Sequence, residues 1–211
     1  METPSTIDHF QFTILRHGES TANANGIHQG QHDFPLSPKG ILQAQEVAQY
    51  FTTNKQKFDY IISSPLQRAR KTAEIIAAKL DLPLELDEIW MERDAGVLSG
   101  IAHEEALIQF PRPEFIGLYD KIGKTGESQW DLYLRAGHAV NQLIHRPFGR
   151  YLIVSHGALI NMVLHVTLGI FPQPNFHGAQ FVLENTSIAQ LNFYPQTHNW
   201  VLQKLIHPPY L

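Results

Sequence analysis

The chain has 211 residues, of which 43% are hydrophobic and 17% are charged, and its formal net charge is −4. This composition is typical of one globular domain and excludes a disordered chain. The absence of cysteine excludes disulfides, thiolate nucleophiles and cysteine-based zinc sites, and the negative net charge argues against nucleic acid as a partner. A phosphate-binding site would therefore be a local cluster of positive charge on a mildly acidic protein.

The sequence shows no sign of a membrane segment. No stretch approaches the roughly 18–20 consecutive apolar residues that cross a bilayer. The N-terminal residues 1–8 lack both the basic region and the apolar region of a signal peptide. A cytoplasmic protein without a membrane partner is therefore expected.

Strands and helices are expected to alternate along the chain. The predicted elements are a strand at 10–15, a helix at 37–51, a strand at 60–63, a helix at 64–80, a strand at 84–86, helices at 102–110 and 127–145, a strand at 151–155, a helix at 158–168, and a hairpin formed by 187–194 and 200–206. Ser37-Pro38 and Ser64-Pro65 predict the N-termini of the first two helices, because serine caps a helix and proline fits its first turn. This order predicts an α/β fold with a mostly parallel central sheet that helices cover on both faces.

Two segments place a histidine and a glycine directly after a predicted strand. Arg16-His17-Gly18 follows the first strand, and His156-Gly157 follows the strand at 151–155. Because ligands of such a sheet bind at the carboxyl ends of its strands, both histidines are expected in one cleft together with Arg68. Neutral histidine is a nucleophile, and guanidinium groups bind phosphate oxygens in bidentate fashion. The pattern predicts phosphate chemistry without a metal, with His17 as the nucleophile.

Phosphoryl transfer away from an alkoxide also needs a general acid. Glu92, in the turn-like segment 91–96, is the candidate, and Asp94 or Glu127 would be next if Glu92 only positions other groups. His28 and His32 lie four residues apart in a loop without the carboxylate pattern of a zinc site. No metal is therefore expected there.

Several motifs follow one another in a fixed order. They are Arg16-His17-Gly18-Glu19-Ser20 with Asn23, Gln29-Gly30-x-x-Asp33 with Leu36-Ser37-x-x-Gly40, Ser63-Ser64-Pro65-Leu66-Gln67-Arg68-Ala69, Glu92-x-x-x-Gly96-x-x-x-Gly100 with Gly126-Glu127-Ser128, and Ser155-His156-Gly157. Together they resemble the histidine phosphatase superfamily, also called phosphoglycerate mutase-like, over most of the chain. The resemblance implies that family's three-layer sandwich, as a single domain over residues 1–211 with a small helical cap at about 101–150.

The resemblance also implies a role for each site residue. His17 becomes phosphorylated, Glu92 donates the proton, and the phosphoryl group is held by Arg16, Arg68 and His156. Asn23 and Gly157 would complete the phosphate-binding set. Glu19 and Ser20 are expected to orient the loop, and no cofactor is implied.

Three functions are compatible with these motifs: a phosphomonoester hydrolase of the phosphatase branch, a cofactor-dependent phosphoglycerate mutase, and a phospho-ligand binding module with negligible turnover. The glycolytic mutases carry a tyrosine where this chain has Ala95 and a lysine where it has His103, and Arg112 stands alone where they have paired arginines. These differences weaken the binding of a second anionic group, so hydrolysis is favoured.

The expected substrate is a small phosphorylated metabolite. The leaving group would contact cap residues, for which the candidates are Phe110, Phe115, Tyr119, Lys121 and Lys124. Sugar phosphates, nucleotides and aromatic esters all stay open on this basis. A homodimer is also left open.

Overall fold

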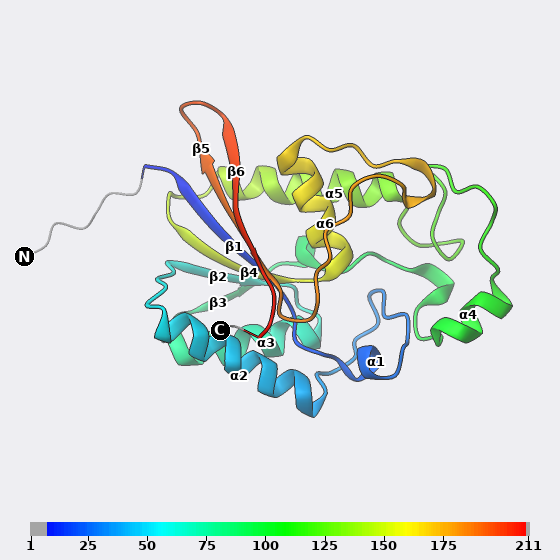
Figure 1. Cartoon of the computed structure of the whole chain (residues 1–211), viewed down its shortest axis with the longest axis horizontal. Helices are drawn as coiled ribbons and strands as arrows, with labels where there is room; N and C mark the ends of the chain where they lie inside the picture. Colours follow the sequence, from blue (N-terminus) through cyan, green and yellow to red (C-terminus); the bar gives the residue numbers. More distant parts are fainter. Residues whose placement is uncertain (1–7, 210–211) are drawn as a thin grey trace, which may run out of the picture.

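The computed structural model describes residues 8–209, so the segment 1–7, on which the expectation about a signal peptide rests, lies outside the described residues. Within that range one sheet of six strands runs in the order β3-β2-β4-β1-β5-β6. The strands are β1 Phe10–Arg16, β2 Tyr60–Ser63, β3 Leu84–Leu86, β4 Arg150–Ser155, β5 Ile188–Tyr194 and β6 Asn199–Ile206. Helices lie on both sides of this sheet, as Figure 1 shows. The predicted three-layer α/β sandwich is confirmed.

The sheet is mostly parallel. Strand β4 pairs in parallel with β1 on one side and with β2 on the other, and β2 pairs in parallel with β3. The last two strands differ, because β5 runs antiparallel to β1 and β6 antiparallel to β5. This confirms the predicted C-terminal hairpin.

The helices occupy two layers and a third region at one end of the sheet. They are α1 Thr21–Ala24, α2 Pro38–Thr53, α3 Gln67–Leu80, α4 His103–Gln109, α5 Gln129–Ile144 and α6 Gly157–Leu168, with 3₁₀ turns η1 Glu88–Trp90, η2 Gly96–Leu98 and η3 Pro174–Phe176. Helices α2 and α3 cover one face of the sheet, and α5 and α6 cover the other (Figure 1). The short helix α1 lies between the predicted strand at 10–15 and the predicted helix at 37–51, where no helix was predicted.

One of the two predicted helix starts is confirmed and the other is wrong. Helix α2 is capped by Ser37, whose Oγ accepts the N–H of Gly40 at 3.0 Å. Helix α3 instead begins after Leu66, and the N–H of Gln67 donates to the carboxylate of Asp33 at 2.6 Å. The predicted cap, Ser64, lies before the helix start: its Oγ accepts the N–H of Leu66 at 3.3 Å and is also hydrogen-bonded to a histidine, as described below.

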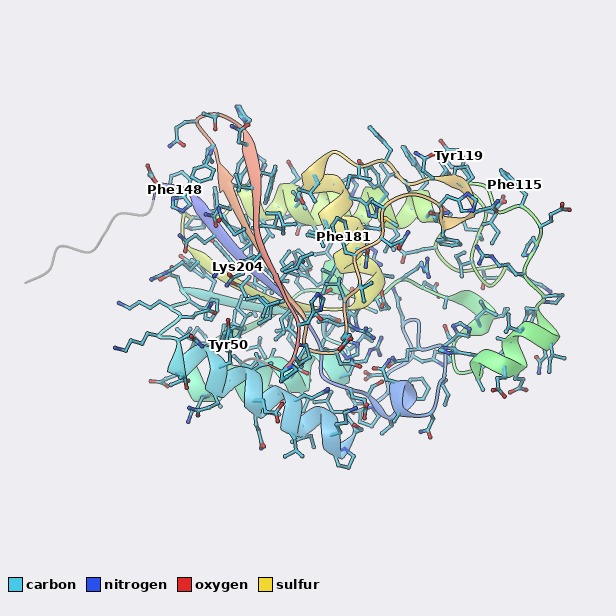
Figure 2. The ribbon with its side chains drawn as sticks, viewed as in Figure 1. Tyr50, Phe115, Tyr119, Phe148, Phe181 and Lys204 are labelled. Carbon is cyan, nitrogen blue, oxygen red and sulfur yellow. The ribbon has the colours of Figure 1, made fainter. Side chains whose placement is uncertain are left out.

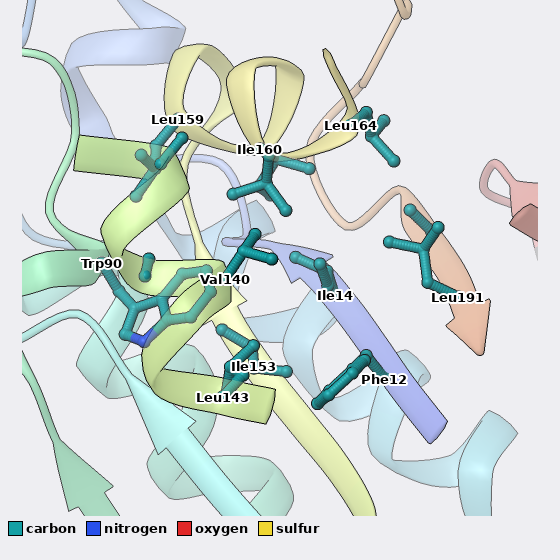
Figure 3. Close-up of a cluster of buried hydrophobic side chains, with 14 of the residues drawn as sticks. Phe12, Ile14, Trp90, Val140, Leu143, Ile153, Leu159, Ile160, Leu164 and Leu191 are labelled. Carbon is teal, nitrogen blue, oxygen red and sulfur yellow. The ribbon is translucent and has the colours of Figure 1, made fainter. Parts of the chain in front are cut away.

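The central strands are buried on both faces. Along β1, Ile14 packs into a cluster under α5 and α6, which Figure 3 shows in close-up, whereas Leu15 packs into a second cluster under α2 and α3. Both side chains are buried. A strand covered on both sides needs apolar residues at successive positions, which explains the run of apolar residues at 14–15 and 152–154.

Part of the region that the sequence predicts to be a cap lies at the end of the sheet where β1 and β4 finish. Helix α4 is at the right of Figure 1, where the segment 110–128 also lies, and the segment 170–187 extends toward this end before it returns to β5. Helix α5, although within the region 101–150, packs on the sheet through side chains such as Leu132 and Leu143. None of the helices within residues 8–209 is long and apolar enough to span a membrane.

Candidate active site

Strand register brings the two predicted histidines together. Arg16 lies opposite Ser155 across β1 and β4, so the residues that follow them, His17 and His156, leave the sheet side by side. Their ring centroids are 5.0 Å apart. Only 2% of His17 and none of His156 is exposed to solvent. The structure therefore assembles the expected pair of imidazoles at the carboxyl ends of neighbouring strands.

The hydrogen bonding of His17 fixes which ring nitrogen carries the proton. Its Nδ1 lies 2.6 Å from the carbonyl oxygen of Gly18, and a carbonyl only accepts, so Nδ1 is the donor. Burial, and then the positive charges of Arg68 and Arg16, hold the pKa of His17 well below its ordinary value. At neutral pH the ring is therefore uncharged, with its lone pair on Nε2, which is the form that can act as a nucleophile.

His156 is held from the neighbouring strand. Its Nε2 shares a 2.8 Å hydrogen bond with Oγ of Ser64, which directly follows β2. Burial is the main reason that the pKa of His156 also lies well below its ordinary value, and the nearby charge of Arg68 adds to this effect. The second imidazole is therefore neutral as well.

Two arginines place fixed positive charge beside the histidines. Arg68 is fully buried, and its terminal nitrogens donate to the carbonyl oxygens of Gly30 and His32, each at 2.8 Å. Burial lowers the pKa of Arg68 to about 10, which still leaves it charged at neutral pH. Arg16 donates through Nη1 to the carbonyl oxygen of Leu183. Both guanidinium groups are thus held by backbone carbonyls and not by carboxylates.

Three nitrogens of this cluster are buried without a hydrogen-bond partner within the described chain: Nε of Arg16, Nε of Arg68 and Nδ1 of His156. A buried donor left without an acceptor costs about 1–3 kcal/mol, so such groups are rare unless they serve a purpose. An anion with several acceptor oxygens satisfies donors of this kind. The geometry is that of an anion-binding site.

Glu92 lies at the first turn of α6. Its carboxylate oxygens accept the N–H groups of Ala158 and Leu159, each at 3.3 Å, and the N–H of Arg93 at 2.8 Å. Because α6 starts at Gly157, directly after His156, these contacts bring the proposed acid to the histidine pair. The helix N-terminus also favours a carboxylate at this position.

Arg135 on α5 was not identified from the sequence. Its guanidinium donates to the carbonyl oxygens of Ile89, Met91 and Glu92 at 2.7–3.1 Å, and to both carboxylate oxygens of Glu127 at 2.7 Å. One side chain therefore clamps the backbone that carries Glu92. The motif at 126–128 points to Glu127, but no local pattern links it to an arginine eight residues later.

The remaining predicted residues line the same region. Oδ1 of Asn23 accepts the N–H of Ser20 and the amide of Asn185, both at 3.2 Å, and Asn185 also donates to the carbonyl oxygen of His17 at 3.1 Å. Asn185 was not identified from the sequence, because a single asparagine just before β5 belongs to no recognisable motif. Gly157 lies against Arg16, since a Cβ at Gly157 would be 3.6 Å from its Nε.

Glu19 and His28 lie apart from this cluster, whereas His32 contacts it through the carbonyl oxygen that accepts from Arg68. The Glu19 carboxylate accepts Oγ of Ser37 at 2.8 Å and Nζ of Lys39 at 2.9 Å, which ties the loop to the start of α2. The ring of His28 contacts that of His103 in a tilted arrangement, with centroids 4.2 Å apart. Within residues 8–209, no group of three or more acidic or histidine side chains is arranged to hold a metal ion.

Comparison with known proteins agrees with this geometry. The chain is 36% identical over 161 residues to the Bacillus subtilis protein named "Uncharacterized phosphatase PhoE", which covers 76% of this chain and 78% of that protein. It is 34% identical over 188 residues to the Citrobacter koseri protein named "Probable phosphoglycerate mutase GpmB", with 87% of this chain and 85% of that protein covered.

Solved structures show the same relationship. Phosphoserine phosphatase from Entamoeba histolytica, in complex with 3-phosphoglyceric acid, superposes with a TM-score of 0.75 at 30% identity, over 95% of this chain and 98% of that chain. Residues 12–206 match the histidine phosphatase superfamily, branch 1. The chain therefore belongs to the histidine phosphatase superfamily and is a phosphatase of that superfamily.

Proposed function

We propose that this protein hydrolyses phosphomonoesters of small metabolites through a phosphohistidine on His17, without a metal. The observation that carries the proposal is the neutral His17, with its lone pair on Nε2, beside Arg16 and Arg68, whose buried Nε groups lack a partner within the described chain. A dianionic phosphate supplies the acceptors that these groups need. The fixed charges of Arg16 and Arg68 would stabilise the phosphoryl group in the transition state.

The reaction would proceed in two displacements. Nε2 of His17 attacks phosphorus, an N–P bond forms, and the P–O bond to the leaving group breaks with its electron pair on oxygen. Glu92 gives a proton to that oxygen, and the alcohol leaves. Water then attacks the phosphohistidine, Glu92 takes a proton from the water, and the N–P bond breaks to return the lone pair to Nε2.

The known relatives support a small-molecule substrate. Solved structures similar to this one include a phosphoserine phosphatase from Entamoeba histolytica at 30% identity and a mycobacterial glucosyl-3-phosphoglycerate phosphatase at 25% identity. Each of these enzymes is named for a substrate that is a phosphomonoester of a small metabolite. A substrate of that class fits a site in which Arg16 and Arg68 lie beside the histidine pair.

Trapping the intermediate tests the proposal. Enzyme treated with a ³²P-labelled phosphomonoester in excess chelator, and then quenched, should carry a phosphoryl group that is acid-labile and base-stable. The label should be absent from His17→Ala and present in His138→Ala, a matched histidine exposed on α5. Label that persists in a folded His17→Ala variant would show that another residue is the nucleophile.

Mutase activity is the second candidate, because relatives at 32–34% identity are named for phosphoglycerate mutase. A mutase returns the phosphoryl group to the glycerate instead of to water. Incubation with 3-phosphoglycerate separates the two functions. Release of inorganic phosphate supports hydrolysis, whereas accumulation of 2-phosphoglycerate supports the mutase.

A further inference from the structure

A cavity of about 740 Å³ lies beside the proposed catalytic residues, and we call it the cap cavity. It lies among α4, the segment that follows α4, and η3. Arg93 and His28 line the wall of the cavity nearest the site. Arg93 directly follows Glu92, and its N–H donates to the Glu92 carboxylate at 2.8 Å. The cap cavity therefore adjoins the segment that carries the proposed acid.

The walls of the cap cavity are strongly cationic. Four positively charged side chains line it, whereas its lining includes a single carboxylate, that of Asp120. The four are Arg93, Arg112, Lys121 and Lys124, of which Lys121 is paired with Asp131 at 2.6 Å. The chain as a whole has a net charge of −4, so this concentration of positive charge is local. Such a field attracts an anionic ligand.

Two of these cations converge on one aromatic ring. The guanidinium carbon of Arg93 lies 5.4 Å from the ring centre of Phe176, and that of Arg112 lies 5.7 Å from the same centre. The Arg93 guanidinium makes no hydrogen bond or ion pair with any of the residues 8–209, and Arg112 donates only to the carbonyl oxygen of Asn175, at 3.0 Å. A carboxylate is the group that pairs with such guanidinium donors.

The rest of the lining is apolar. It includes Leu98, Leu107, Phe110, Phe115, Ile116 and Ile122. Phe115 lies at the end of the molecule opposite the β5–β6 hairpin, as Figure 2 shows. A volume of 740 Å³ lies in the range of about 300–1,000 Å³ that holds drug-sized ligands, far more than the few atoms of serine or glycerate need.

Resting on the proposed function, we infer that the cap cavity selects phosphomonoesters whose leaving group joins a large, flat apolar body to a carboxylate. The phosphoryl group would bind at Arg16 and Arg68, the apolar body would pack against the aromatic and aliphatic walls, and the carboxylate would pair with Arg93 and Arg112. The sequence showed Arg112 as a single arginine between two prolines. In the tertiary structure its partner is Arg93, which directly follows Glu92 in the chain.

Paired synthetic substrates test the inference. We expect kcat/KM for 4′-carboxybiphenyl-4-yl phosphate to exceed that for biphenyl-4-yl phosphate by about tenfold, since a charged hydrogen bond contributes on that order. Arg112→Gln should abolish most of this preference. Arg146→Gln is the matched control. Arg146 pairs with Glu85 on β3 and does not line the cap cavity, so this variant should show the same preference as the wild type.

A binding measurement makes the outcome independent of turnover. Calorimetric titration with the product 4′-hydroxybiphenyl-4-carboxylate should give tighter binding than with 4-hydroxybiphenyl, and Arg112→Gln should remove the difference. Equal binding of both compounds to the wild type would overturn the inference about the cap cavity. Selective binding without hydrolysis of either phosphate would leave the cavity assignment standing and refute the proposed function instead.

Discussion

At the scale of single residues, burial sets the protonation state of the site. His17 and His156 are both buried beside two arginines, and each of these features lowers a histidine pKa. A histidine in water would be partly protonated near pH 6.5 and would lose its nucleophilic lone pair. The same positive charges that would bind phosphate therefore also keep the nucleophile neutral.

The role of Glu92 can be tested by changing the leaving group. Glu92→Gln keeps the shape of the side chain but removes the proton it would donate. We expect kcat for an alkyl phosphate to fall by about 10²–10⁴-fold, because an alkoxide leaves poorly without protonation. The loss for p-nitrophenyl phosphate should be smaller, since its phenolate leaves unaided. Steady-state kinetics on both substrates, with Glu104→Gln on the exposed face of α4 as the control, give the comparison.

Equal losses on the two substrates would indicate that Glu92 positions other groups. Asp94 would then be the next candidate. Glu127 is a poorer one, because both of its carboxylate oxygens are bonded to Arg135 and one also accepts the N–H of Asp94 at 2.9 Å.

At the scale of elements, helix α5 holds the segment 89–92, which ends in Glu92, through the side chain of Arg135. Arg135 donates to three carbonyl oxygens in the segment 89–92 and to the carboxylate of Glu127. This arrangement uses the planar, five-donor geometry of a guanidinium, which a lysine ammonium does not provide. Helix α5 therefore has two roles, since its apolar face completes the core and its arginine holds the segment that carries Glu92.

Arg135→Lys should retain the charge but release the carbonyl contacts. A displacement of the acid by about 1 Å typically costs on the order of 10²-fold in rate, so we expect a loss of that size in kcat for alkyl phosphates. The loss should be smaller for p-nitrophenyl phosphate, because the effect acts through Glu92. Arg150→Lys, which alters an ion pair with Asp59 at the opposite end of β4, serves as the control. A loss that is equal for both substrates, with lowered thermal stability, would indicate a structural role alone.

At the scale of the whole molecule, two buried neutral histidines link global stability to pH. In the unfolded chain they bind protons near pH 6.5, whereas in the folded protein they do so only well below that value. Between these two values the unfolded state binds more protons, so the free energy of unfolding decreases as the pH falls. The stabilising contribution is complete above pH 6.5 and is lost progressively below it.

We therefore expect the unfolding free energy of the wild type to decrease as the pH falls from 7.5 to 5.5, because both buried histidines contribute to this slope. His17→Gln should show a smaller decrease over the same range, because one of the two buried histidines is then absent. Urea unfolding at several pH values measures both slopes, and His138→Gln on the exposed face of α5 is the control. Identical slopes for the wild type and His17→Gln would contradict a lowered pKa at His17.

The sequence by itself determined the order and kind of the elements and the residues of the histidine cluster. Strands β1 and β4 and helices α2 and α6 were predicted within a few residues, because burial on one or both faces leaves a regular apolar pattern in the chain. The strand-end positions of His17 and His156 were equally visible, since a parallel sheet collects the carboxyl ends of its strands at one edge.

Only the tertiary structure decided how that cluster is supported and what surrounds it. The N–H of Gln67 at the start of α3 donates to Asp33, which lies in a distant loop. Arg135 donates to the carbonyl oxygen of Met91, more than forty positions earlier in the chain. Arg93 and Arg112 meet at Phe176, more than sixty positions further along the chain. Contacts of this kind join residues with no local periodicity, so they arise only when the packed elements bring separate loops to one end of the sheet.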